Sequence, residues 1–282
     1  MSIVDVKEIV EKKRNSLKRE ILDLRDKGII PKLAVILAND VEASRIYVSR
    51  KRKLCQELGI EEVEYLFDSK CKTEDILDTI DKLNHNNEID GILVQLPLFK
   101  HLDESRIIDS ILPEKDVDGF SAVNVGRLYQ GNPTVVPCTP KGILTILKEL
   151  DKDLKGKNAV VVGRSQIVGK PMASLLLNED MTVTICHSRT TNLPEHTRNA
   201  DVLVVATGVP HLIKADMVKE DAIVIDVGMN RLKDKLVGDV DTENVSSKAK
   251  YVTPVPGGVG LTTVLSLAQN VVELSKRRLN NR

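Results

Sequence analysis

Tyr47 and Lys51 form the pair in the first half of the chain whose types and spacing best suit chemistry. They are four residues apart in a segment of helical pattern, residues 43–58, so both side chains lie on one face, one turn apart. A tyrosine ring can stack on a flat heterocycle, and a nearby lysine can transfer a proton or polarise a carbon–nitrogen system. The segment carries four other basic residues, so Lys51 could equally be one more solvated charge.

Three further polar side chains, Gln95, Asp116 and Asp118, are candidate site residues in the first half of the chain. Gln95 lies in the expected strand 91–96, where a buried amide must find hydrogen-bond partners and where ligand sites gather in parallel sheets. Asp116 and Asp118 precede Gly119 in a loop. For Gln95, a structural role and a functional role both remain open. Asp116 and Asp118 could cap a turn or bind the donor groups of a heterocycle.

A glycine-rich turn in the second half of the chain indicates a nucleotide site. The apolar run 159–162 ends at Gly163, Arg164 and Ser165, and Gly169 opens a helical pattern. Free N–H groups in the first turn of such a helix can receive a phosphate. The spacing is not G-x-G-x-x-G, so an ordinary strand–turn–helix connection is the alternative.

The residues after the next strand favour NADP over NAD. A fold that binds NAD normally has an acid there to accept the ribose 2′-OH. Here the strand is followed by Ser188 and Arg189, and with Arg164 these offer donors and positive charge that suit a 2′-phosphate. The alternative is that these are solvated surface residues without a ligand.

Small residues occur at the strand ends 206–208 and 226–229, and the loop 254–260 is rich in proline and glycine. Both features are typical of backbone that lines a ligand site.

The elements that must position these residues alternate between strand and helix, which predicts an α/β fold with parallel sheets covered on both faces. The expected helices are 4–27, 43–58 (ended by Gly59), 73–84 (capped by Thr73), 139–150 (capped by Thr139), 169–178, 194–199, 214–219 and 262–279. The expected strands are 33–37, 63–67, 91–96, 158–162, 181–186, 201–206, 222–227 and 250–253. Residues 98–136 are less regular and predict a long functional loop region.

Composition excludes several classes of function. The 282-residue chain has 41 basic and 41 acidic residues, 2% aromatic residues and no Trp, which argues against nucleic-acid binding. Its four cysteines form no C-x-x-C pair, so we expect reduced thiols in a cytoplasmic protein and no metal site. The charged N-terminus is no signal peptide, and no apolar run is long enough to cross a membrane.

Six motifs in series resemble the bifunctional methylenetetrahydrofolate dehydrogenase/cyclohydrolase family, known in bacteria as FolD. They are Ala43-Ser-x-x-Tyr47-Val-x-x-Lys51, Val94-Gln95-Leu96-Pro97-Leu98, Lys115-Asp-Val-Asp118-Gly119, Pro137-Cys-Thr-Pro140-x-Gly142, Val162-Gly163-Arg164-Ser165-x-Ile-Val168-Gly169-x-Pro171 and Pro254-Val-Pro256-Gly257-Gly258-Val259-Gly260. They occur in the family's order over nearly the whole chain, which makes the resemblance highly specific.

The resemblance implies two domains with a cleft between them. Residues 1–138 would form the folate-binding and catalytic α/β domain, and residues 139–261 a Rossmann-like NADP-binding domain, with helix 262–282 packing back on the first. NADP+ would take a hydride from 5,10-methylenetetrahydrofolate, and water would open the methenyl product to 10-formyltetrahydrofolate. The family resemblance also implies a homodimer formed through the cofactor domain.

The same resemblance implies the roles of single residues. Lys51, held by Gln95, is expected to be central to hydrolysis, and Asp118 to bind the pterin ring. Tyr47 is expected to stack on the folate. The folate pocket would be lined by Val94, Leu96, Pro256, Gly257, Gly258, Val259 and Gly260. The cofactor contacts would come from Gly163, Arg164, Ser165, Ser188 and Met229.

Two departures from the family pattern lie near the expected folate site. Asn39 replaces a glycine and Glu42 a proline, and we expect Asn39 to keep the loop because Asn tolerates a left-handed turn. Residues 261–263, Leu-Thr-Thr, replace Pro-Met-Thr and are expected to alter substrate affinity. Two alternatives remain: a dehydrogenase without useful cyclohydrolase activity, and a catalytically silent folate- or nucleotide-binding regulator.

Overall fold

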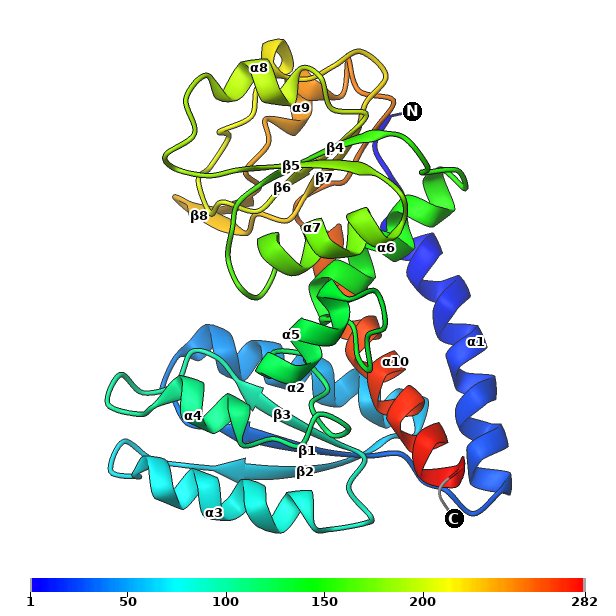
Figure 1. Ribbon diagram of the computed structural model, residues 1–282, viewed down its shortest axis with the longest axis vertical. Helices are drawn as coiled ribbons and strands as arrows, with labels where there is room; N and C mark the ends of the chain where they lie inside the picture. Colours follow the sequence, from blue (N-terminus) through cyan, green and yellow to red (C-terminus); the bar gives the residue numbers. More distant parts are fainter. Residues whose placement is uncertain (1, 281–282) are drawn as a thin grey trace. The chain divides into compact units, whose positions relative to one another are not determined.

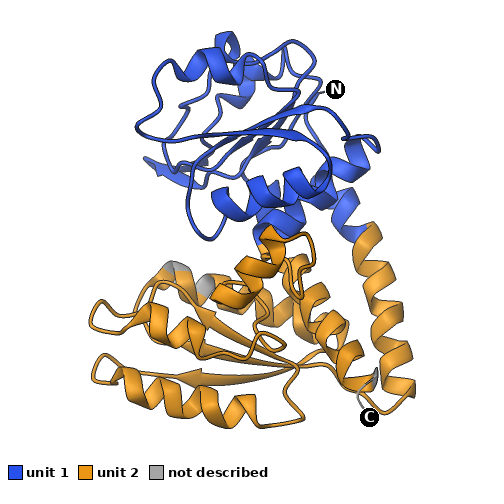
Figure 2. Cartoon of the chain, viewed as in Figure 1, with its two compact units in different colours: residues 1–11, 139–263 blue, residues 12–138, 264–282 orange. Residues whose placement is uncertain are grey.

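The computed structural model describes residues 2–280, apart from the side chains of residues 43, 46 and 280. The chain divides into two compact units (Figure 2): unit 1 comprises residues 1–11 and 139–263, and unit 2 comprises residues 12–138 and 264–282. Two long helices, α1 (Val6–Asp26) and α10 (Val259–Asn280), contribute residues to both units. The predicted α/β architecture with parallel sheets is confirmed.

Unit 2 is built on a three-stranded parallel sheet with the strand order β2-β1-β3. Its elements are β1 (Lys32–Leu37), α2 (Glu42–Leu58), β2 (Glu61–Leu66), α3 (Thr73–Asn84), β3 (Gly91–Gln95), α4 (Glu104–Asp109) and α5 (Ala122–Tyr129). On one face of the sheet, Ala34 and Ile36 pack with Ile76 and Ile80 of α3 and with Ile107 of α4. Burial of these apolar side chains stabilises the sheet.

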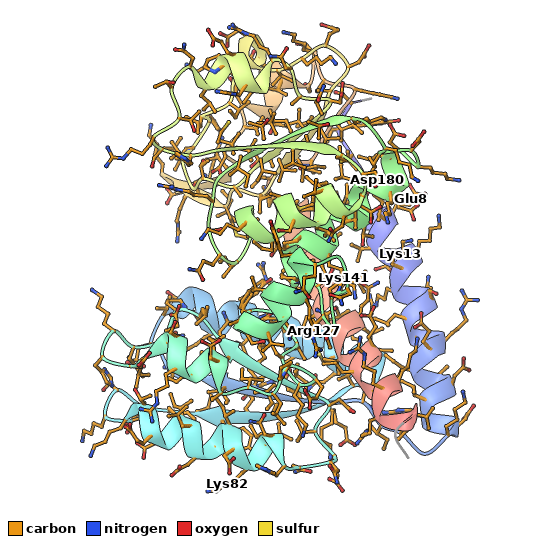
Figure 3. The ribbon with its side chains drawn as sticks, viewed as in Figure 1. Glu8, Lys13, Lys82, Arg127, Lys141 and Asp180 are labelled. Carbon is orange, nitrogen blue, oxygen red and sulfur yellow. The ribbon has the colours of Figure 1, made fainter. Side chains whose placement is uncertain are left out.

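The segment 98–136, predicted as a less regular, long loop region, contains two short helices, α4 and α5, that were not predicted. The Asp103 carboxylate accepts from the N–H of Arg106 (3.1 Å) at the start of α4. The Ser121 hydroxyl accepts from the N–H of Asn124 (3.4 Å) at the start of α5. Arg127 of α5, labelled in Figure 3, donates to the hydroxyl of Thr134. Helices this short show too little periodicity to be recognised from the pattern of apolar residues.

Of three residues predicted to cap or end a helix, Gly59 is confirmed, and Thr73 and Thr139 are wrong. Gly59 ends α2 in the left-handed conformation (φ 86°), as expected. Thr73 and Thr139 are not N-caps, because both lie inside their helices and both hydroxyls bind elsewhere. Thr73 Oγ1 accepts from the N–H of Asp103 (3.1 Å), and Thr139 Oγ1 accepts from the hydroxyl of Thr263 (3.2 Å).

Unit 1 is built on a five-stranded parallel sheet with the order β10-β7-β6-β4-β5. Its elements are α6 (Cys138–Leu150), β4 (Asn158–Val162), α7 (Gly169–Asn178), β5 (Thr182–Cys186), α8 (Leu193–Thr197), β6 (Val202–Val205), the 3₁₀ turn η1 (Ala215–Met217), β7 (Ile223–Asp226), β8 (Asn230–Leu232), β9 (Lys235–Val237), α9 (Thr242–Val245) and β10 (Tyr251–Val252). Helix α7 lies on one face of this sheet and α8 and α9 on the other (Figure 1).

The first residues of the chain belong to unit 1 because they pair with its last strand. The N–H of Val4 donates to the carbonyl of Val252 (2.9 Å), whose own N–H donates to the carbonyl of Ser2 (2.7 Å). The expected helix 214–219 is reduced to η1, and the antiparallel hairpin β8–β9 was not predicted. Among residues 2–280, no helix is long and apolar enough to span a membrane.

Candidate active site

A buried polar group formed by Lys51, Gln95 and Tyr47 is the chemically distinctive feature of unit 2. Lys51 is only 5% exposed, and its Nζ donates to Oε1 of Gln95 (3.1 Å). The same ammonium lies 4.6 Å from the centroid of the Tyr47 ring, a favourable cation–π arrangement. Nε2 of Gln95 donates to the carbonyl of Leu96 (2.8 Å), which orients the amide with its oxygen towards the lysine. The structure therefore brings the predicted pair Tyr47 and Lys51 together with Gln95, which was singled out separately in the sequence.

The loop after β1 is tied to the loop after β3, so the helix that carries Lys51 is held beside the strand that carries Gln95. Asn39 makes this tie: its Nδ2 donates to the carbonyl of Pro97 (2.7 Å), and its Oδ1 accepts from the N–H of Val41 (2.9 Å). Asn39 is not among the residues with positive φ, so the expectation of a left-handed turn is wrong. The side chain of Asn39, rather than its backbone freedom, keeps the loop.

The two loop acids have separate tasks. Asp116 is buried; its Oδ1 accepts from the N–H of Gly119 (2.9 Å) and its Oδ2 from the N–H of Ser121 (2.9 Å), so it caps the turn. Asp118 accepts from the thiol of Cys138, with Sγ 3.4 Å from Oδ1. Burial raises the pKa of Asp118, and the charge of Asp116 adds to this while that of Lys51 opposes it. Of the two acids, Asp118 is the one left for a ligand.

Tyr47 belongs to the same electrostatic neighbourhood. Burial raises the pKa of its phenol, and Cys138 and Asp118 add to the effect. The ring under the Lys51 ammonium is therefore a neutral phenol at physiological pH.

One residue that sequence reasoning missed, Asn270, holds the Asp118 segment in place. Nδ2 of Asn270, on α10, donates to the carbonyls of Val117 (2.8 Å) and Val136 (2.9 Å). Asn270 is completely buried, and Cys138 lies two residues beyond Val136. In the sequence, Asn270 could have been noticed only because it is a polar residue on the apolar face of the last helix.

The side chains of Val94 and Leu96 take part in the hydrophobic core of unit 2. Val94 packs in the cluster with Ile36 and Ile76, and Leu96 lies against the same cluster. Successive side chains of a strand point to opposite faces, so Val94 faces away from the side on which Gln95 meets Lys51. Only the backbone of Val94 and Leu96 is suited to contact a ligand beside Lys51.

In unit 1, the turn between β4 and α7 depends on its two glycines. A Cβ on Gly163 would lie 2.2 Å from the carbonyl oxygen of Ala206, and one on Gly169 would lie 2.2 Å from that of Gly163. The Ser165 hydroxyl accepts from the N–H groups of Val168 (3.2 Å) and Gly169 (3.3 Å). Two of the N–H groups expected to be free for a phosphate are thus already bonded to Ser165.

The exposed side chains around this turn fit a phosphorylated dinucleotide. Arg164, Ser165, Ser188 and Arg189 are all exposed, and no acidic residue occurs at 163–178 or 187–192. These positions follow β4 and β5 at the carboxyl edge of the sheet, where dinucleotides bind. A set of donors without a carboxylate matches a 2′-phosphate better than a free 2′-OH.

Met229 and the loop 254–260 also lie in unit 1. The Met229 side chain is 61% exposed, and its Cε would be 3.8 Å from a Cβ on Gly260. Gly257 has φ 96°, and a Cβ on Gly258 would lie 2.3 Å from the carbonyl oxygen of Pro254. Val259 and Gly260 are the first residues of α10. The loop therefore requires Gly257 and Gly258, and Gly260 lies near the side chain of Met229, a predicted cofactor residue.

Comparison with known proteins gives concordant matches over both halves of the chain. Residues 4–118 match the family model described as tetrahydrofolate dehydrogenase/cyclohydrolase, catalytic domain, and residues 137–279 match its NAD(P)-binding domain. The bifunctional protein FolD of Campylobacter hominis is 53% identical over 280 residues, which cover 99% of each chain.

Solved structures agree with this. The bifunctional enzyme FolD of Campylobacter jejuni superposes with a TM-score of 0.96 at 47% identity, covering 99% of each chain. The FolD of Trypanosoma brucei, whose structure is a complex with NADP cofactor and an inhibitor, has a TM-score of 0.93 at 36% identity, covering 98% of this chain and 97% of that one.

Proposed function

The chain belongs to the tetrahydrofolate dehydrogenase/cyclohydrolase family, and from this membership we propose how its residues divide the two activities. It oxidises 5,10-methylenetetrahydrofolate to the 5,10-methenyl form with NADP+ and hydrolyses that product to 10-formyltetrahydrofolate. The observation that carries the assignment of residues is the buried Lys51–Gln95 hydrogen bond of 3.1 Å beside the Tyr47 ring.

Hydrolysis requires the management of a proton, and Lys51 is the residue to which we assign it. Water adds to the cationic one-carbon bridge and loses a proton to give a carbinol. The carbinol hydroxyl then loses its proton as the formyl C=O forms, and the bond to one ring nitrogen breaks as that nitrogen is protonated. A lysine fixed by Gln95 can relay a proton between these positions, the kind of step worth about 10²–10⁴ in rate. Tyr47 would stack on the folate, and Asp118, with its raised pKa, would bind the pterin ring.

Oxidation makes different demands on the chain. When bound, NADP+ accepts a hydride, a step that needs alignment and no general base. Accordingly, the residues that we assign to cofactor binding are turn glycines and exposed donors: Gly163, Arg164, Ser165 and Ser188, with Met229. We assign the backbone of Pro256, Gly257, Gly258, Val259 and Gly260 to folate binding, and likewise the backbone of Val94 and Leu96.

Neither alternative function is favoured. A dehydrogenase without cyclohydrolase activity has no need of a buried lysine held by a glutamine, and this chain keeps both. A silent regulator has no need of the catalytic residues, yet this chain carries them together with a complete set of cofactor motifs.

The substitution Lys51→Met tests the assignment. It keeps the length of the side chain but removes the ammonium, so hydrolysis of methenyltetrahydrofolate should fall by about 10²-fold or more. NADPH binding should be unchanged, because the residues assigned to the cofactor lie in unit 1. Hydrolysis is followed by the loss of methenyl absorbance, and binding by NADPH fluorescence.

Lys53→Met is the matched control, because Lys53 is exposed on the same helix and should tolerate the change. Wild-type hydrolysis in a folded Lys51→Met variant would refute the role of Lys51. A wild-type protein that forms no methenyl product from methylenetetrahydrofolate and NADP+ would refute the function itself.

We further propose that the protein is a cytoplasmic homodimer that uses the edge of the unit 1 sheet. Strand β5 pairs with β4 on one side and with no other strand of the described chain. Ile185 on this strand is 42% exposed, and Leu177 on the adjoining helix α7 is 56% exposed. An unpaired strand edge with exposed apolar side chains is suited to pair with a second copy. The four cysteines are buried and form no disulfide, which agrees with a reducing compartment.

A further inference from the structure

Two buried aspartates, Asp226 and Asp239, link the loops that follow β6 and β7 in unit 1. Both side chains have no exposed surface. Oδ2 of Asp239 accepts from the N–H of Thr207 (2.6 Å), the hydroxyl of Thr207 (2.9 Å) and the N–H of Gly208 (2.9 Å). Oδ1 of Asp239 accepts from Nδ2 of Asn230 (2.8 Å). One carboxylate therefore ties the residues after β6 to the segment that follows β7.

Asp226, the last residue of β7, holds Asp239 in turn. Its Oδ1 accepts from the N–H groups of Gly228 (2.9 Å) and Asp239 (3.0 Å), and its Oδ2 accepts from the N–H of Val240 (3.0 Å). The Asp226 carboxylate thus fixes the backbone of the residue whose side chain makes the link. Each carboxylate has hydrogen bonds on both oxygens, as burial of a charged group requires.

The packing around these carboxylates leaves no room for a side chain at Gly228 or Gly238. A Cβ on Gly228 would lie 2.2 Å from Oδ1 of Asp239, and one on Gly238 would lie 1.7 Å from Oδ2 of Asp226. Glycine at both positions therefore serves the link. So tight an arrangement can hold two loops at a fixed separation, which a solvent-exposed ion pair cannot.

These loops stand where one end of a dinucleotide would lie. The proposed 2′-phosphate and diphosphate residues follow β5 and β4, and β6 and β7 come next in the sheet order. A cofactor that extends along the carboxyl edge of the sheet from β5 would place its nicotinamide end over β6 and β7. Val209 (47% exposed) and Met229 (61% exposed) present apolar surface there, and a Cβ on Gly208 would meet open space.

We propose that Asp239, supported by Asp226, is a positioning residue for the nicotinamide end of the cofactor: it sets the separation of the loops that carry Gly208 and Met229. The inference rests on the proposed cofactor role of unit 1. Asp239 touches neither substrate nor cofactor in this scheme. It acts through the loops that it holds.

The substitution Asp239→Ala tests this. It removes all four side-chain hydrogen bonds, so the Kd for NADPH should rise by about tenfold, as expected when binding groups lose their fixed spacing. The KM for NADP+ should rise in parallel, and the KM for methylenetetrahydrofolate should change far less. Hydrolysis of methenyltetrahydrofolate without NADP+ should stay within about twofold of wild type, because Lys51 and Gln95 belong to unit 2.

A conservative variant and a control separate positioning from folding. Asp239→Asn should restore most of the NADPH affinity. The amide oxygen of the new side chain can accept from Thr207 and Gly208, and its NH₂ group can donate to the Asn230 amide oxygen once the Asn230 amide has rotated. Asp241→Ala is the control, since the Asp241 carboxylate accepts from Nδ2 of Asn244 (2.8 Å) away from the link. It should leave the Kd for NADPH unchanged.

Asn230→Ala is a milder variant should Asp239→Ala not fold. It breaks only the tie to the segment after β7, and the Kd for NADPH should rise by about threefold. A wild-type Kd in folded Asp239→Ala, or in Asn230→Ala where the former does not fold, would overturn the inference. A wild-type protein that binds no NADPH would instead contradict the cofactor role on which the inference rests.

Discussion

Asp118 and Asp226 are two carboxylates whose pKa values are raised by burial, yet their hydrogen bonds give them different tasks. Asp226 accepts three backbone N–H bonds, so its capacity is used by the fold. Asp118 accepts, within the described chain, only from the Cys138 thiol. Asp118 can therefore accept further hydrogen bonds from a ligand, whereas both oxygens of Asp226 are already bonded to backbone N–H groups.

The pKa of Asp226 predicts how stability depends on pH. Burial is the largest cause that raises it to about 6, and the charge of Asp239 adds to the increase. The folded state therefore holds a proton that the unfolded chain releases near pH 4. The contribution of this group to stability is present below about pH 4 and is lost as the pH rises to about 6, a change on the order of 3 kcal/mol.

Comparison with Asp226→Asn isolates that contribution, because the amide does not titrate and other groups cancel in the difference. The free energy of unfolding of wild type minus that of the variant should fall between pH 4.5 and 6.5 and then level off. Denaturant titrations at several pH values measure it. A difference that does not change with pH would show that Asp226 does not titrate in this range.

At the level of elements, one glycine lets helix α6 approach the first turn of α10. A Cβ on Gly142 would lie 2.5 Å from Oγ1 and 2.9 Å from Cβ of Thr262, which is buried. Gly142→Ala should therefore lower the free energy of unfolding by about 1–3 kcal/mol, the usual effect of overpacking. Denaturant unfolding at neutral pH measures the change.

Gly126→Ala is the matched control because Gly126 also lies inside a helix, α5, but has no atom within 4 Å of an added Cβ. There the change should raise the free energy of unfolding by up to about 1 kcal/mol through helix propensity. If both variants were stabilised alike, the close approach at Gly142 would be of no energetic importance.

For the whole molecule, the proposed homodimer predicts that one charge on β5 produces monomers. Ile185→Lys places an ammonium on the exposed edge strand, where it would repel its counterpart in a second copy. Light scattering after size-exclusion chromatography should give twice the chain mass of 31.2 kDa for wild type and 31.2 kDa for the variant.

Leu232→Lys is a suitable comparison, because Leu232 is a similarly exposed apolar residue on the separate hairpin strand β8. It should leave the mass unchanged. A dimeric Ile185→Lys variant would exclude β5 as the interface, and a monomeric wild type would exclude the homodimer.

Local patterns predicted much of the fold. Apolar runs were enough to place β1, β3 and β4 within a residue or two, and the alternation of strands with helices predicted parallel sheets. These predictions succeeded because each depends on neighbours in the chain, namely side-chain period, helix ends and glycine turns. Short elements such as α4, α5 and the hairpin β8–β9 offered too few residues for a period to show.

The amino-acid sequence by itself determined the α/β class, the family and the cofactor, because six motifs and the lack of an acid after β5 are properties of residue order. Only the tertiary structure decided which polar residues support the proposed site. Asn39, Asn270 and Asp239 act through hydrogen bonds to segments 31 to 153 residues away. Such bonds depend on where folding places a distant donor or acceptor, which no local pattern records.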